Sequence, residues 1–163
     1  MYFYRYLSPL GGMTLAGTED QLKALWFDGQ KHRSLPEGAV LQLTPVFEQT
    51  VRWLETYFEG REPSSPPSLS PEGTEFQRRV WELLSEIPYG ETVSYGLLAG
   101  RLSVSAQAVG GAVGRNPIAI IIPCHRVIGA DGGLVGYSGG LSRKEALLSL
   151  EKTERIAVTR SDN

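Results

Sequence analysis

The chain has 163 residues, a formal net charge of -2, 41% hydrophobic and 21% charged residues, which is the composition of a folded globular protein and excludes extensive disorder. No apolar run is long enough to cross a bilayer, and the start of the chain lacks the pattern of a signal peptide, so we expect a soluble cytoplasmic protein. A single cysteine and two histidines supply neither an internal disulfide nor a structural zinc site. We therefore expect no metal and no cofactor.

The first 60 residues predict a small sheet and a helix. Short β-like runs at residues 2–7, 13–16 and 22–27 indicate a meander of antiparallel strands. Thr44 is a typical N-cap before a proline, and apolar residues recur at helical spacing, so a helix is expected over residues 45–58. Residues 61–73 are rich in proline and serine and are predicted to be a linker.

A second group of elements follows the linker. Thr74 and Gln77 have the spacing of a capping box, and an apolar stripe continues the helix toward Pro88. Ser94 and Ser105 are N-cap candidates for two short helices, over residues 95–102 and 106–113, joined by a three-residue turn. This pair predicts a helix-turn-helix, and a last helix is expected over residues 141–150.

The helix predicted over residues 106–113 is unusual because Gly110 and Gly111 lie in its middle, at a cost of about 1 kcal/mol each. Something must therefore approach its backbone closely. Gln107 is its main long polar side chain, so a DNA contact made by this helix would read shape and backbone more than base sequence. The surrounding segment, residues 93–129, contains no acid, and its arginines fit a phosphate-bearing partner.

The only cysteine, Cys124, follows a run of branched apolar residues. Residues 118–122 predict a buried strand that Pro123 ends, which would place Cys124 at the mouth of a pocket. A cysteine is nucleophilic as the thiolate and needs a base or a positive charge beside it, and His125 and Arg126 follow directly. Taken alone, a lone cysteine is more often a small buried apolar residue.

A glycine-rich segment follows the cysteine at residues 136–140. It lacks the Lys-Ser/Thr of a Walker phosphate loop, so we interpret it as a close-fitting pocket wall.

Several motifs occur together in one order: Pro88-Tyr89-Gly90, Thr92-Val93-Ser94-Tyr95, Ala108-Val109-Gly110, Asn116-Pro117, Pro123-Cys124-His125-Arg126-Val127, Gly136-Tyr137-Ser138-Gly139-Gly140, and Lys144-Glu145 before Glu151. In these motifs the chain resembles the O6-alkylguanine-DNA alkyltransferases, over residues 74–153. The resemblance implies an α+β protein: a ribonuclease H-like scaffold domain at 1–60, a linker at 61–73, a winged helix-turn-helix-like alkyltransferase domain at 74–153 and a tail at 154–163.

The resemblance also implies roles for individual residues. Cys124 would accept the alkyl group, His125 would be its base through a water molecule, and Glu151 would orient His125. Asn116 would bond near the cysteine turn, and Tyr95 would donate to the departing guanine. The implied substrate-binding residues are Val127, Gly136, Tyr137 and Ser138, and the implied DNA-binding residues are Ser94, Ala106, Gln107, Ala108, Gly110, Gly111, Arg115 and Arg126.

The implied partner is double-stranded DNA that contains O6-alkylguanine, with the damaged nucleotide extruded from the helix. Each molecule would act once, because no residue is placed to cleave the thioether. We expect a monomer without a membrane or metal partner, and cooperative binding along DNA stays open. The chain departs from the family at Gln107, where an arginine usually fills the space left by the flipped base, which predicts weaker duplex binding.

The sequence leaves three alternatives open. The chain could be a lesion sensor that transfers nothing, although such relatives carry tryptophan in place of the cysteine. It could be a Cys-His-Glu hydrolase with repeated turnover, or a DNA-binding regulator whose cysteine is only buried.

Overall fold

The computed structural model describes residues 1–31, 33–133 and 136–161, with side chains up to Lys152 in the last helix. The chain divides into two compact units. The first unit contains Met1–Glu72 together with Pro117–Ala119, and the second contains Gly73–Asn116 and Ile120–Asn163. No helix among the described residues is both long enough and apolar enough to span a membrane.

The first unit is built on a four-stranded sheet of order β3-β2-β1-β4. Its strands are β1 (Tyr2–Ser8), β2 (Gly11–Gly17), β3 (Leu22–Phe27) and β4 (Val40–Leu41). The first three pair antiparallel, which confirms the predicted meander. The sequence analysis missed β4, which pairs parallel with β1 and has only two residues, both exposed, so no alternation marks it.

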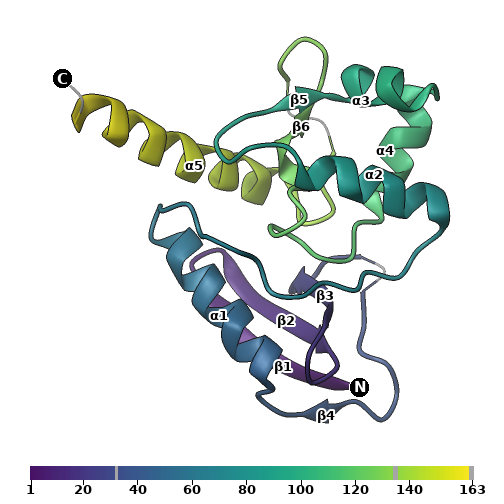
Figure 1. The fold of residues 1–163 in the computed structure, drawn as a ribbon, viewed down its shortest axis with the longest axis vertical. Coiled ribbons are helices and arrows are strands. Elements are labelled where there is room, and N and C mark those ends of the chain that lie inside the picture. Colours follow the sequence, from purple (N-terminus) through teal and green to yellow (C-terminus); the bar gives the residue numbers. More distant parts are fainter. Residues whose placement is uncertain (32, 134–135, 162–163) are drawn as a thin grey trace. The chain divides into compact units, whose positions relative to one another are not determined.

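The helix α1 (Pro45–Phe58) begins and ends where the sequence predicts. The hydroxyl of Thr44 accepts a hydrogen bond from the backbone of Phe47, and Pro45 occupies the first turn, where no donor is needed. Figure 1 shows α1 lying along one face of the sheet. Its buried residues, which include Phe47 and Leu54, join the fully buried side chains of β2 and β3 in one apolar core.

Two other segments cover the outer edge of β3. Leu22 exchanges backbone hydrogen bonds of 2.9 and 2.8 Å with Ser68 and Ser70, and Leu25 does the same with Pro117 and Ala119, both at 2.9 Å. These bonds satisfy edge groups that would otherwise be open to another strand. The predicted linker is therefore held against the sheet at residues 68–70 and is not a free tether along its whole length.

The second unit is mainly helical, with α2 (Glu75–Ser85), α3 (Tyr95–Leu102) and α4 (Ala106–Gly114). The predicted capping box is present: Gln77 N donates to the Thr74 hydroxyl at 3.1 Å and Thr74 N donates to Gln77 Oε1 at 3.0 Å. Ser94 and Ser105 cap α3 and α4, as predicted. The turn between these helices contains Ser103 in the left-handed region, at φ 56°.

A short parallel pair of strands completes the support of the second unit. It joins β5 (Val93–Ser94) to β6 (Val127–Ile128), and β6 directly follows the 3-10 turn η1 (Cys124–Arg126). This strand pair therefore fixes the position of the start of α3 relative to the cysteine turn. Figure 1 shows β5 leading into α3.

Two predicted elements need correction. The predicted strand at 118–122 is wrong: only Ile118 forms a bridge, to Leu25, and Ile120 has a left-handed backbone with φ 69°. All five residues are buried, so their apolar character reflects burial and not strand pairing. The last helix, α5 (Leu141–Ser161), continues beyond the predicted end at residue 150 because no glycine or proline follows Gly140 to stop it.

Candidate active site

The backbone turns sharply just before the cysteine. Pro123 has φ -80° and ψ 64°, and Cys124 N donates to the carbonyl oxygen of Ile122 at 2.8 Å, which is the geometry of an inverse γ-turn. The 3-10 turn then begins at Cys124, so Cys124 and His125 do not alternate across a strand. Cys124 is buried, with 6% of its surface exposed.

Asn116, two residues after the end of α4, fixes this turn. Its Nδ2 atom donates to the Ile122 carbonyl at 2.8 Å, so this one oxygen accepts hydrogen bonds from both the Asn116 side chain and the Cys124 backbone. Burial raises the pKa of the Cys124 thiol, and the Asn116 amide together with the charge of Lys144 offsets part of that rise. The thiol therefore needs a proton acceptor to become a nucleophile near neutral pH.

The candidate acceptor is the next residue in the chain. His125 is fully buried, and its Nε2 atom lies 2.6 Å from Glu151 Oε2. Burial lowers the pKa of His125, with a partial opposing effect of Glu151, so the imidazole is neutral at neutral pH. A carboxylate can only accept a hydrogen bond, so the proton of the neutral ring sits on Nε2, and Nδ1 carries the lone pair that can take a proton.

Glu151 is held by three groups of the second unit. Burial by itself would raise its pKa, but hydrogen bonds and charges of His125 and Arg126 lower the pKa to about 2. Arg126 Nε donates to Oε1 at 2.9 Å, and the backbone N–H of Gly90 donates to the same oxygen at 3.0 Å. Glu151 is 1% exposed and is therefore a buried carboxylate.

The structure places Arg126 differently from the prediction that it contacts DNA. The residue is buried, its guanidinium binds Glu151 and donates to the Ile87 carbonyl at 2.8 Å, and it lies 5.6 Å from the ring centroid of Tyr89. It therefore neutralises the carboxylate that orients His125 and does not present its charge to a phosphate. No local sequence signal distinguishes these two uses of an arginine.

Cys124 opens into a small cavity of about 110 Å³. Most of the residues that line this cavity were predicted from the sequence to have a catalytic, substrate-binding or DNA-binding role. Val113 and Gly114 were not. The lining consists of Tyr95, Gly110, Val113, Gly114, Cys124, Gly136, Tyr137 and Ser138. Burial raises the pKa of the Tyr137 hydroxyl well above its usual value, and this hydroxyl makes no hydrogen bond to any residue in the described part of the chain.

Ser138 and Val127, both predicted to bind the substrate, make hydrogen bonds within the second unit. Ser138 lines the cavity and its hydroxyl donates to the Gly114 carbonyl at 2.8 Å. Val127 is fully buried outside the lining, and its carbonyl accepts a hydrogen bond from Lys144 Nζ at 2.7 Å.

Lys144 has no role among the sequence-based predictions. Its side chain is fully buried, its ammonium group also donates to the Gly136 carbonyl at 3.1 Å, and it lies 5.9 Å from the ring centroid of Tyr95. Burial lowers the pKa of Lys144, an effect that the Cys124 thiolate opposes. Its spacing from Glu151 on α5, seven residues or about two turns, puts the two on one helix face and was the available signal.

The outer surface of α4 carries the other predicted DNA contacts. Ala106, Gln107, Ala108, Gly111 and Arg115 are exposed. A Cβ atom added at Gly110, Gly111 or Gly114 would meet nothing within 4 Å, so packing in the described part of the chain does not require these glycines. The surface above these glycines is open in the described structure. Ser94, also assigned to DNA, caps α3 with its hydroxyl.

No group of three or more His, Cys, Asp or Glu side chains in the described ranges is arranged to hold a metal ion. The second unit thus defines a class: a helix-turn-helix protein in which a buried cysteine lines a small pocket and the next residue of the chain forms a buried His–Glu pair. The chain belongs to the O6-methylguanine DNA methyltransferase family. Residues 1–65 match its ribonuclease-like domain, and residues 75–153 match its DNA binding domain.

Individual relatives agree with this assignment. A methylated-DNA–protein-cysteine methyltransferase of Methanosarcina acetivorans is 49% identical over 154 residues, which cover 93% of this chain and 98% of the relative. The crystal structure of Mycobacterium tuberculosis OGT in complex with DNA superposes with a TM-score of 0.87 at 45% identity and covers 94% of both chains. An O6-methylguanine-DNA methyltransferase from Pyrococcus kodakaraensis has a TM-score of 0.65 at 26% identity and covers 91% of this chain and 98% of its own.

Proposed function

We propose that this protein repairs DNA by moving the alkyl group of O6-alkylguanine onto its own Cys124, once per molecule. The observation that carries the proposal is the joining, in one buried site, of a cavity-lining thiol to a His–Glu pair, in a chain that belongs to this family. Its direct partner would be duplex DNA containing the lesion, bound by a monomer without a cofactor.

The proposed reaction starts with loss of the thiol proton. Nδ1 of His125 accepts that proton, through a bridging water molecule, and the imidazolium that forms is stabilised by Glu151 at 2.6 Å. The thiolate then attacks the alkyl carbon, so an S–C bond forms while the C–O6 bond breaks and its electron pair moves to the guanine. Tyr95 lines the cavity beside Cys124 and is our donor to the leaving guanine, which finally carries the proton lost by the thiol.

The lesion must leave the base stack to reach Cys124, at a cost of a few kcal/mol. We assign the docking of DNA to α4, since its exposed glycines and alanines admit a backbone at close range, as in a minor groove. Gln107 would fill the space left by the extruded base, and Arg115 would contact a phosphate. We assign the pocket wall to Gly136, Tyr137 and Ser138.

Intact-mass spectrometry tests the proposal. The protein is mixed with a duplex that carries one O6-methylguanine, and Cys124→Ser is the matched control. We expect the wild type alone to gain the mass of one methylene group, in a one-to-one yield that does not increase with excess substrate.

Other outcomes separate the alternatives. Retention of the lesion duplex without a mass gain would indicate a lesion sensor. Repeated turnover of an ester substrate would indicate a Cys-His-Glu hydrolase. Sequence-specific DNA binding by a protein whose Cys124 thiol does not react would indicate a regulator.

A further inference from the structure

The first unit has a cavity of its own, of about 310 Å³, which no step of the proposed repair reaction uses. Its floor includes Ala16 and Ala24, which face each other across β2 and β3. Side chains directly opposite in an antiparallel pair point to the same face, so both lie on the face opposite to that of the core residues Leu15 and Leu25. Two alanines at this position leave a hollow that larger strand residues would fill.

A β-bulge directs a cation to this cavity. The register of β2 and β3 shifts between Ala16 and Gly17, so that Lys23 is skipped in the pairing while its neighbours Leu22 and Ala24 are paired. Bulges redirect side chains and are frequent beside binding sites. A Cβ atom at Gly17 would lie 2.2 Å from the Gln21 carbonyl, so the bulge needs glycine there. Lys23 accordingly lines the cavity instead of joining the core face of β3.

The other lining residues give the cavity one flat apolar wall and a positive rim. Trp26 follows Ala24 on the same face of β3 and is 8% exposed, and Pro36 contributes further apolar surface. Lys23 and Arg33 supply two positive charges against one negative charge, from Glu72. Lys23 lies 3.2 Å from Glu72, but the Glu72 side chain is 80% exposed, so this ion pair is weak and an anion can replace it.

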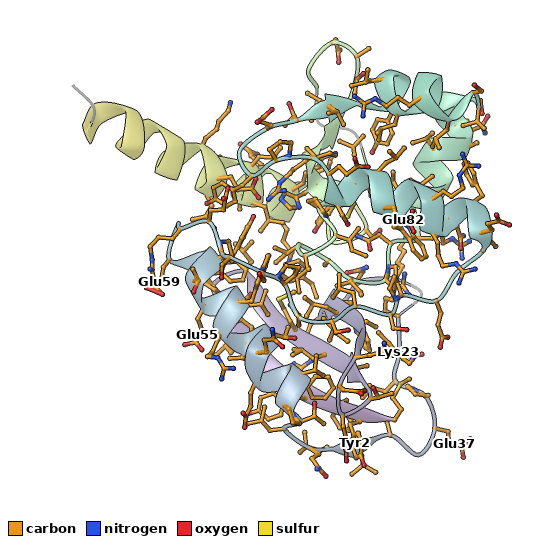
Figure 2. All side chains as sticks on the ribbon, in the orientation of Figure 1. Tyr2, Lys23, Glu37, Glu55, Glu59 and Glu82 are labelled. Carbon is orange, nitrogen blue, oxygen red and sulfur yellow. The ribbon has the colours of Figure 1, made fainter. Side chains whose placement is uncertain are left out.

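Two acidic residues of the first unit do not offset this charge. Figure 2 shows Glu55 on α1 and Glu59 just beyond the end of α1, both away from Lys23. A cavity of about 300 Å³ with apolar walls and a few polar groups is the usual form of a small-molecule site. A cationic rim adds a preference for an anion, and arginine in particular pairs with phosphate oxygens.

We propose that this cavity binds a nucleotide unit, with the base against Trp26 and the phosphate at Lys23 and Arg33. Two ligands share this chemistry: a free mononucleotide and the terminal nucleotide of a DNA strand. The site is separate from the alkyl-transfer pocket, because all residues that line it belong to the first unit.

Titration calorimetry with guanosine monophosphate tests the proposal, with guanosine and inorganic phosphate as the partial ligands. We expect the nucleotide to bind in the micromolar to low millimolar range, and each partial ligand to bind at least about tenfold more weakly. Arg33→Met and Lys23→Met should each weaken nucleotide binding about tenfold or more, the effect of losing one charge-assisted contact. Ala24→Leu should abolish binding by filling the hollow.

The control is Lys31→Met, which removes an exposed cation close in sequence to Arg33 that does not line the cavity, and it should leave binding unchanged. Single-turnover methyl transfer should persist in all these variants. A second arm uses a short single-stranded oligonucleotide: tighter binding than that of the mononucleotide, lost in Arg33→Met, would identify a strand terminus as the source.

Nuclear magnetic resonance of the wild type keeps the test independent of variant folding. Bound nucleotide should shift the amide signals of Ala16 and Ala24 and the indole signal of Trp26. Absence of these shifts at millimolar nucleotide, or binding that Ala24→Leu and Lys23→Met leave intact, would overturn the proposal.

Discussion

Asn116 Nδ2 donates a hydrogen bond of 2.8 Å to the carbonyl oxygen of Ile122, the same oxygen that receives the backbone N–H of Cys124. Asn116 lies two residues after the end of α4 at Gly114, and its side chain holds the turn that presents the thiol. The segment that follows the helix we assign to DNA and the backbone of the cysteine we assign to the lesion therefore share one hydrogen-bond acceptor.

Asn116→Ala should loosen this turn. We expect unfolding free energy to fall by about 1–3 kcal/mol, since a buried polar contact is lost. Methyl transfer should fall more than tenfold, because small displacements of a reacting group have large rate effects. Urea denaturation and single-turnover kinetics measure the two, and Gln107→Ala, an exposed change on the preceding helix α4, is the control for stability. An unchanged transfer rate would show that Asn116 does not position the thiol.

The rate of methyl transfer should be insensitive to mild acid. Burial lowers the pKa of His125 below its ordinary 6.5, so the neutral base persists at pH values where an exposed histidine would already be protonated. We expect a constant single-turnover rate between about pH 8 and about pH 6.5, with the fall at lower pH. A midpoint above 6.5 would contradict a desolvated His125 as the base.

Glu151→Gln should remove a pH-dependent part of the stability. The pKa of Glu151 falls from 4.5 in the unfolded chain to about 2 in the folded one, so the folded state favours the carboxylate. The corresponding contribution, on the order of 3 kcal/mol, is fully present above about pH 4.5 and is lost as the pH falls toward about 2. Urea denaturation should give a large difference between wild type and variant at neutral pH that shrinks through this window. A difference that stays constant with pH would exclude ionised Glu151 as its source.

Lys144→Met should make the thiol less acidic. The buried ammonium favours the Cys124 thiolate, so its removal should raise the pH midpoint of alkylation by iodoacetamide. Lys152→Met, on the same helix with an exposed side chain, is the matched control. Superimposable pH profiles for the two variants would show that Lys144 only ties Val127 to Gly136.

Gln107→Arg should strengthen duplex binding and accelerate repair. The exposed position at the start of α4 admits a longer side chain, and an added cation near a phosphate steepens the salt dependence of binding by about one unit. Reaction of Cys124 with iodoacetamide should not change. Equal affinity and equal repair rate in wild type and variant would show that Gln107 already does what arginine does in relatives.

The parts of the fold that were predictable from sequence are those with local signals. Thr44, Thr74, Ser94 and Ser105 each cap a helix that starts where predicted, because an N-cap bonds to a backbone group only three residues away. The run at 118–122 failed as a strand because a continuous apolar segment reports burial and not pairing. Ile120 in a left-handed conformation has no sequence signal at all.

The candidate site was predictable through its motifs and less so through its charges. His125, the residue after Cys124, lies 2.6 Å from Glu151, although Glu151 is distant in sequence and only the family resemblance selected it. Arg126 was assigned to the wrong partner, because a sequence shows that a charge exists but not which buried carboxylate it faces. Lys144 was missed because its hydrogen-bond partners are carbonyl oxygens, which every residue has.

The open space above Gly110, Gly111 and Gly114 has a consequence for evolution. Each glycine inside a helix lowers its stability by about 0.5–1 kcal/mol relative to alanine, and no neighbour within 4 Å in the described structure prevents that exchange. Selection for thermostability alone would replace these glycines. Their presence indicates that α4 is kept smooth at the expense of rigidity, and that a more heat-resistant form of this protein has to gain its stability elsewhere.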